Sequence, residues 1–104
     1  PQHELAQAQM ENYSGMVSVR IARGETMAAI MAKELKVFHY AVSLGHHRSL
    51  VYWIGTDELV RSSYQIEGSQ LESYREMAGE GVFRMSIGLE DPEDLCEDLD
   101  QVLR

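Results

Sequence analysis

Three histidines near the middle of the chain are the first residues whose types suggest chemistry. They are His39, His46 and His47, and Glu58 follows shortly after them. Imidazole and carboxylate groups are common protein ligands of zinc. Adjacent side chains on an extended segment point in opposite directions, however, so we expect His46 and His47 not to bind one ion. No regularly spaced set of His and Cys residues accompanies them, and the sequence therefore predicts no metal site.

Two side chains that could act as nucleophiles lack the surroundings that activate one. Ser43 stands in Val-Ser-Leu-Gly rather than in the Gly-x-Ser-x-Gly turn of α/β hydrolases. Cys96 lies beside Leu95 in a segment rich in carboxylates, which oppose the ionisation of a thiol. Neither Ser43 nor Cys96 is therefore predicted to be a catalytic nucleophile.

The charge and length of the chain exclude several classes of partner. Its 104 residues carry a net charge of −8 and contain no basic patch of the kind that nucleic-acid binders use. An acidic surface is repelled by anionic membranes, and the longest apolar runs are far shorter than the roughly 20 residues that span a bilayer. Cys96 is the single cysteine, which excludes an internal disulfide and suits a reducing compartment, so we expect a cytoplasmic protein.

Hydrophobic periodicity divides the chain into alternating helices and strands. Helices are expected over residues 2–11, 25–36, parts of 57–78 and the segment after Asp91, and strands over 16–22, 37–42, 50–54 and 82–87. Asp91 can cap free amides and Pro92 fits the first helical position, which marks the start of the last helix. The side chains expected to face the core from the two best-patterned helices are Met27, Ile30, Met31, Leu35, Leu95, Leu99, Val102 and Leu103. Residues 90–100 contain seven carboxylates and no basic residue, a pattern typical of a solvent-exposed helix face.

This order of elements predicts one α+β domain, with a small antiparallel or mixed β-sheet covered by helices on one face. In the last strand Phe83, Met85 and Ile87 share one side. If they face the helices, Arg84 lies on the other face of the sheet, which is free to meet another molecule or domain.

Three segments together resemble a known family. They are residues 13–18 (Tyr-Ser-Gly-Met-Val-Ser), 41–45 (Ala-Val-Ser-Leu-Gly) and 83–91 (Phe-Arg-Met-Ser-Ile-Gly-Leu-Glu-Asp), the last followed by Asp94-Leu95 and Asp98-Leu99. In this order and spacing they resemble the C-terminal domain of the pyridoxal-phosphate enzymes of Cys/Met metabolism (transsulfuration). That family includes methionine γ-lyase, cystathionine γ-lyase and β-lyase, cystathionine γ-synthase and the acylhomoserine sulfhydrylases. The similarity covers nearly the whole chain and is weakest over residues 46–80.

The resemblance implies a site for the α-carboxylate of an amino-acid substrate. In the family an Arg on the last core strand and the Ser-Leu-Gly loop hold this carboxylate, and Arg84, Ser43 and the amide of Leu44 match these groups. The planar guanidinium of arginine can make two parallel, charge-assisted hydrogen bonds to a carboxylate, which lysine cannot. Fixing the carboxylate also sets which bond at Cα lies perpendicular to the cofactor plane, and so which bond breaks.

The resemblance also implies pyridoxal 5'-phosphate, which needs a lysine for its Schiff base, an acid and a phosphate cradle. The two lysines, Lys33 and Lys36, end an expected helix with no Gly-rich loop nearby, so neither is expected to bind it. We therefore expect a large cofactor-binding domain that is not among these residues. Residues 1–13 would be a connecting helix, and residues 14–104 the carboxylate-binding domain of a lyase or transferase for sulfur-containing amino acids. Such a domain would be inactive alone, and the full-length enzyme would form homo-oligomers.

The chain departs from the family pattern in one region. His46-His47-Arg48 stands where members often have Gly-Val-Glu, and residues 52–57 (Tyr-Trp-Ile-Gly-Thr-Asp) replace a segment with His-Pro and Met-Thr-His. That segment lies near the substrate side chain in the family, so the substrate and the choice between β and γ chemistry stay open. Tyr52 and Trp53 are expected either to line an aromatic pocket or to belong to the sheet core.

A second interpretation belongs to a different functional class. Residues 16–87 also follow the strand-helix-strand-strand-helix-strand order of ferredoxin-like domains. Such domains bind amino acids at dimer interfaces, so the chain would then be a stand-alone amino-acid-binding or regulatory module. Shared element order is weak support for a function.

Overall fold

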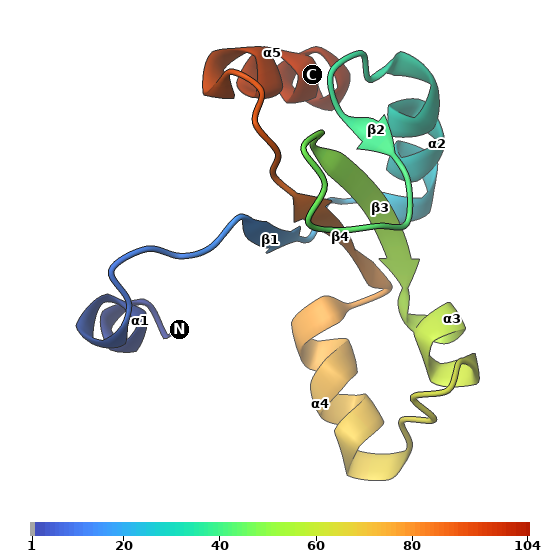
Figure 1. Cartoon of the computed structure of the whole chain (residues 1–104). Helices are drawn as coiled ribbons and strands as arrows, with labels where there is room; N and C mark the ends of the chain where they lie inside the picture. The colour runs from blue at the N-terminus through green and yellow to red at the C-terminus, as the bar shows by residue number, and fades with distance from the viewer. Residues whose placement is uncertain (1) are drawn as a thin grey trace.

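The computed structural model describes residues 2–104, and its elements follow the expected order (Figure 1). The helices are α1 (His3–Gln9), α2 (Gly24–Glu34), α3 (Thr56–Arg61), α4 (Gly68–Ala78) and α5 (Pro92–Leu103). The strands are β1 (Met16–Val19), β2 (His39–Tyr40), β3 (Leu50–Gly55) and β4 (Gly81–Ser86). The helical region predicted over 57–78 is thus two helices. Pro1, which the sequence assigns to the connecting helix, lies outside the described residues.

The four strands form one mixed sheet in the order β1-β4-β3-β2. Strand β4 pairs antiparallel with β1 and with β3, whereas the short β2 runs parallel to β3. The predicted α+β class is confirmed. Since β4 has a partner on each side, the directions of its side chains are fixed by two ladders of hydrogen bonds.

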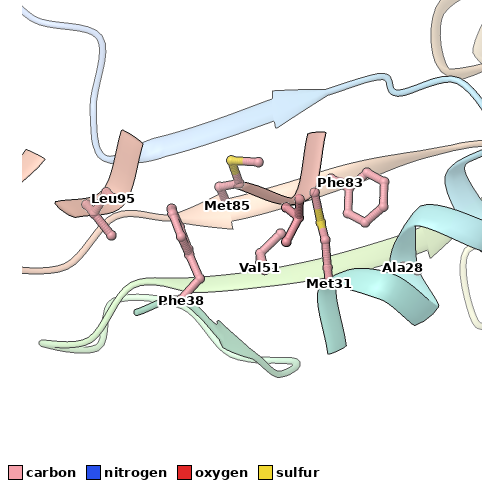
Figure 2. Packing of buried hydrophobic residues seen from close by; sticks show 8 residues of the cluster. Ala28, Met31, Phe38, Val51, Phe83, Met85 and Leu95 are labelled. Carbon is pink, nitrogen blue, oxygen red and sulfur yellow. The ribbon is translucent and has the colours of Figure 1, made fainter. Parts of the chain in front are cut away.

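The hydrophobic core lies on the face of the sheet that packs against α2 and α5 (Figure 1). Val51 of β3, Phe83 of β4 and Met31 of α2 are completely buried, and Leu95 of α5 is 6% exposed. Figure 2 shows these side chains together in the space between strands and helices. Each contributes about 1.5–3 kcal/mol by leaving water, so this cluster is the main source of stability.

Helices α2 and α5 bury narrower stripes than the periodicity predicts. Met31, Leu95 and Val102 are buried as expected, but Ile30 is 37% exposed and Leu103 is 46% exposed. Ile30 is rotated by about 100° around the helix from the buried Met31. Leu103 occupies the last turn of α5, immediately after the buried Val102. The prediction of burial is therefore wrong for both residues.

Strand β2 begins at His39, later than the expected residue 37, because a carboxylate binds the preceding amides. Asp98 of α5 accepts hydrogen bonds from Lys36 at 2.8 Å through Oδ1, and from Val37 at 2.9 Å and Phe38 at 2.8 Å through Oδ2. These amides are consequently not available for pairing with a strand. Asp98 is only 4% exposed, so the prediction that residues 90–100 are a solvent-exposed face is wrong at this position.

Burial on its own would raise the pKa of Asp98, since a charged carboxylate loses its hydration. The three amide hydrogen bonds, together with one from Gln101, outweigh that effect and lower the pKa below the ordinary value of 3.8. Asp98 is therefore a charged group in the interior that joins α5 to the turn between α2 and β2.

The start of helix α5 follows the prediction. The Asp91 side chain accepts a hydrogen bond from the Glu93 amide at 2.8 Å, and Pro92 occupies the first turn. Strand β4 differs at its end: it stops at Ser86, and Ile87 is 39% exposed instead of belonging to the core. The predicted alternation therefore holds for Phe83 but does not extend to Ile87.

Helix α1 is separate from the sheet in Figure 1, and none of its residues is buried. This position is compatible with a connecting helix, which stays a prediction. Strand β1 ends at Val19 instead of residue 22, and the following Arg20 donates to the carbonyl of Met77 at 3.1 Å, at the end of α4. Within residues 2–104, no helix has both the length and the apolar character needed to cross a membrane.

Candidate functional site

Arg84 lies on the face of the sheet opposite the hydrophobic core, in the central strand β4. Arg84 stands in register between Ser18 of β1 and Tyr52 of β3. Ser18 is exposed, and Tyr52 and Arg84 are only partly buried. The strand neighbours of Arg84, Phe83 and Met85, are buried in the core on the opposite face. The guanidinium therefore extends from the face that lies away from α2 and α5.

The loop after β2 reaches this guanidinium. Arg84 Nη2 donates a hydrogen bond to the backbone carbonyl of Ser43 at 3.3 Å. The Ser43 amide in turn donates to the Ala41 carbonyl at 3.2 Å, so the chain turns tightly just before this contact. Two of the residues that the resemblance assigns to carboxylate binding, Arg84 and Ser43, thus lie together.

The groups expected to bind an anion are accessible. Ser43 and Leu44 are both exposed, the latter by 58%. None of the hydrogen bonds within residues 2–104 uses the Ser43 hydroxyl or the Leu44 amide. In the same part of the chain, the ion pairs join Arg75 to Asp57 and Arg104 to Asp100, and neither includes Arg84. The described residues therefore leave the charge of Arg84 without a carboxylate partner.

A serine that the sequence analysis did not single out supports the loop. Ser86 lies two residues after Arg84 on the same face of β4, and it is 3% exposed. Its hydroxyl oxygen accepts a hydrogen bond from the Gly45 amide at 3.0 Å. Gly45 has a φ of +68°, a conformation in which glycine is favoured. The two-residue period of the strand places Ser86 beside Arg84, and this is the signal by which it could have been found.

Tyr52 and Trp53 face opposite sides of the sheet. Trp53 packs in the core, with its ring 4.9 Å from that of Phe83, whereas Tyr52 shares the open face with Arg84. The Tyr52 ring lies 5.5 Å from that of Tyr40, another residue missed by the sequence analysis. Burial raises the pKa of the Tyr40 hydroxyl above its ordinary value of 10.0. The core interpretation thus fits Trp53, whereas Tyr52 lies on the open face and its part in a substrate pocket stays a prediction.

The histidine pair differs from its expected geometry. His46 and His47 lie where the loop bends, with ring centroids 4.1 Å apart, so the expectation that they point in opposite directions is wrong. Adjacent side chains diverge only where the backbone is extended, and here it is not. Over residues 2–104 no three His, Cys, Asp or Glu side chains lie close enough to hold a metal ion.

A cavity of about 490 Å³ lies at the other end of β3 from the Ser43 loop. Its walls include Trp53 and Arg75 and the carboxylates Glu25, Asp57, Glu58 and Glu80. Four carboxylates and a single cation make this cavity unfavourable for a substrate carboxylate. The candidate site is therefore the surface around Arg84 and not this cavity.

The sequence profile of the Cys/Met metabolism PLP-dependent enzymes matches residues 1–104 of the chain. The chain belongs to this family. Human cystathionine γ-lyase is 41% identical over 106 residues, covering 100% of this chain and 24% of its own length. Cystathionine γ-synthase of Mycobacterium bovis is 37% identical over 103 residues, covering 99% of this chain and 24% of its own length.

Solved structures of the Cys/Met metabolism family share the fold. The metB protein of Corynebacterium glutamicum superposes with a TM-score of 0.69 at 38% identity, over 98% of this chain and 24% of its own. Cystathionine γ-synthase of Xanthomonas oryzae pv. oryzae, solved in complex with cystathionine, gives 0.70 at 28% identity, over 99% of this chain and 25% of its own. The chain thus spans about a quarter of the length of each of these relatives. The comparisons favour the enzyme interpretation over the stand-alone module.

Members of the Cys/Met metabolism family depend on pyridoxal phosphate. The lysines of this chain do not fit its attachment near Arg84. Lys33 belongs to α2, which packs on the Val51 and Phe83 face of the sheet, and Lys36 follows that helix. Both are exposed on the side away from Arg84. That neither lysine binds the cofactor stays a prediction.

Proposed function

We propose that these residues are the substrate-carboxylate-binding part of a pyridoxal-phosphate-dependent lyase or transferase that acts on sulfur-containing amino acids. The observation that carries the proposal is the position of Arg84. Its guanidinium stands on the open face of the sheet, 3.3 Å from the carbonyl of Ser43 and without a carboxylate partner among residues 2–104.

The chemistry of these groups suits the α-carboxylate of an amino acid. Arg84 uses one donor on Ser43 and retains others of its five N–H groups for an anion. The Ser43 hydroxyl and the Leu44 amide add two neutral donors from the exposed loop. Each hydrogen bond to a charged group contributes about 1.5–3 kcal/mol, so the three residues together would hold a carboxylate firmly.

The relatives suggest the first substrate to test. Human cystathionine γ-lyase and the cystathionine γ-synthases are named for reactions of cystathionine, and the Xanthomonas enzyme was solved with cystathionine bound. We propose cystathionine as a substrate or product, with methionine as the competing candidate. Tyr52, which lies beside Arg84 on the open face, would then contact the substrate side chain.

The cofactor would be held by residues outside this chain, because Lys33 and Lys36 lie on the wrong side of the sheet. Residues 14–104 would orient the substrate without supplying a reacting group, which by itself can account for a large share of a rate. Assembly into homo-oligomers and a cytoplasmic location belong to the same proposal.

The proposal is tested by assaying the full polypeptide that carries these residues. With added pyridoxal phosphate, it is expected to turn over L-cystathionine or L-methionine, measured as thiol or 2-oxo-acid release. The 104-residue chain alone, with the same additions, is expected to be inactive. Turnover by the 104-residue chain, or no turnover of any sulfur-containing amino acid by the full polypeptide, would contradict the proposal.

A further inference from the structure

The loop that carries Ser43 is attached at its far end to a carboxylate. Ser49, the last residue of the loop, is completely buried. Its amide donates to Glu90 Oε1 at 2.7 Å and its hydroxyl donates to Glu90 Oε2 at 2.7 Å. Ser49 therefore donates two hydrogen bonds to Glu90, one to each carboxylate oxygen.

The same serine connects Glu90 to the strand that bears Arg84. The Ser49 hydroxyl oxygen accepts a hydrogen bond from the Gly88 amide at 2.8 Å, and the Leu89 amide donates to the His47 carbonyl at 2.8 Å. The segment after β4 thus contacts the loop at three consecutive residues. A loop tied at this many points has little freedom to shift relative to β4.

Gly88 permits this contact because it has no side chain. A Cβ atom at Gly88 would lie 2.3 Å from the His47 carbonyl oxygen and 2.7 Å from the Ser49 nitrogen. Backbone therefore packs directly on backbone where the two segments meet, and the spacing between loop and strand is fixed.

Partial burial on its own would raise the pKa of Glu90, but the two hydrogen bonds from Ser49 and the nearby charge of Arg48 lower it below the ordinary value of 4.5. Glu90 is a carboxylate that accepts through both oxygens, and the lowered pKa keeps it charged to a lower pH than an ordinary glutamate. Its charge belongs to the segment of seven carboxylates that the sequence predicted to be a solvent-exposed face, a prediction that is wrong here as it is at Asp98.

We infer that Glu90 is a positioning residue for the substrate-carboxylate site. It holds Ser49, Ser49 fixes the end of the loop, and the loop places Ser43 and Leu44 opposite Arg84 on the adjacent strand. Glu90 itself does not contact the substrate. The inference rests on the proposed function, since it concerns the same carboxylate site.

The test measures kcat and KM for L-cystathionine in the full polypeptide loaded with pyridoxal phosphate. The variants are Glu90→Gln, which retains one acceptor, Glu90→Ala and Ser49→Ala, with Glu97→Gln as a matched exposed carboxylate on α5. We expect KM to rise roughly tenfold in Glu90→Ala, a loss of binding free energy comparable to that of one hydrogen bond. We expect a smaller rise of KM in Glu90→Gln. We expect kcat per cofactor-loaded enzyme to change little and Glu97→Gln to behave as the native enzyme.

A merely structural role would give a different result. Lower activity in proportion to the folded fraction, with an unchanged KM in Glu90→Gln and Ser49→Ala, would overturn the inference even if Glu90→Ala fails to fold. Arg84→Ala, measured in parallel, separates this outcome from failure of the proposed function. A raised KM in Arg84→Ala alone removes Glu90 from the site, whereas no effect of Arg84→Ala removes the site itself.

Discussion

Arg84 and Ser43, 41 residues apart in the sequence, meet through a hydrogen bond of 3.3 Å from the guanidinium to the serine carbonyl. The bond uses the backbone of Ser43 and not its hydroxyl. Consequently the contact fixes the two segments relative to each other while leaving the hydroxyl and the remaining guanidinium N–H groups available. A site of this kind is built before any ligand arrives, which reduces the entropy lost on binding.

The carboxylate of Asp98 is expected to be a large single contribution to stability. In Asp98→Asn the side-chain NH₂ cannot accept the amide hydrogen bonds of residues 36–38, so at least one buried donor is left unpaired. We expect the free energy of unfolding to fall by about 2–3 kcal/mol in urea titrations. Glu97→Gln, which changes an exposed carboxylate in the middle of the same helix, is the control and should lie within about 0.5 kcal/mol of the native chain. Equal stabilities of the two variants would contradict the role of Asp98.

The same carboxylates predict how stability changes with pH. The pKa values of Asp98 and Glu90 are lowered in the folded chain, from ordinary values of 3.8 and 4.5. Their contribution is therefore fully present above the ordinary values and is lost as the pH falls through the lowered ones. Urea titrations should show a native free energy of unfolding that falls below about pH 4, and a shallower fall for Asp98→Asn. Parallel curves for the two chains would be inconsistent with a lowered pKa.

A substitution at Gly88 tests the close packing between the segment after β4 and the backbone of residues 47–49. Gly88→Ala would place Cβ 2.3 Å from the His47 carbonyl oxygen, and neither backbone can move without breaking the hydrogen bonds around it. We expect a loss of about 1–3 kcal/mol by thermal unfolding. Gly15→Ala is the control, because its nearest contact would be an acceptable 3.4 Å. A neutral effect of Gly88→Ala would show that the two segments are not closely packed.

The two faces of the sheet should respond differently to truncation. Phe83→Ala removes a completely buried ring and is expected to cost about 3–5 kcal/mol. Tyr52→Ala removes a partly exposed ring whose partner is Tyr40 and should cost about 1 kcal/mol. Chemical unfolding of both variants checks this; similar costs would mean that the face bearing Tyr52 is covered as well.

Local sequence patterns were sufficient for most of the fold. The two-residue period of β4 placed Phe83 and Met85 on one side, and both are buried; the helical period of α5 predicted the burial of Leu95. The same patterns failed for Asp98 and Glu90, whose partners lie 62 and 41 residues away. A run of carboxylates has the same composition whether it faces water or backbone amides, so only the tertiary structure could distinguish the two.

Only part of the candidate site was predicted from the sequence, because some of its residues are identified only by their tertiary contacts. Arg84 and Ser43 came from the resemblance to a family, and strand alternation then placed Arg84 on the open face. Ser86 and Tyr40 were missed because a single serine or tyrosine in a strand carries no local signal of its role. Their importance comes from contacts with Gly45 and with Tyr52 across the sheet.

The most direct test is the affinity of the full polypeptide for L-methionine and for L-methioninamide, which lacks the carboxylate charge. Removing the guanidinium in Arg84→Ala should weaken methionine binding by about 2–4 kcal/mol, a factor of about 30 to 1000, with a smaller loss in Arg84→Lys. Binding of the amide should be weak in all three proteins and nearly unchanged by the substitutions. If methionine and its amide lose affinity equally, or if neither loses any, Arg84 does not bind the substrate carboxylate.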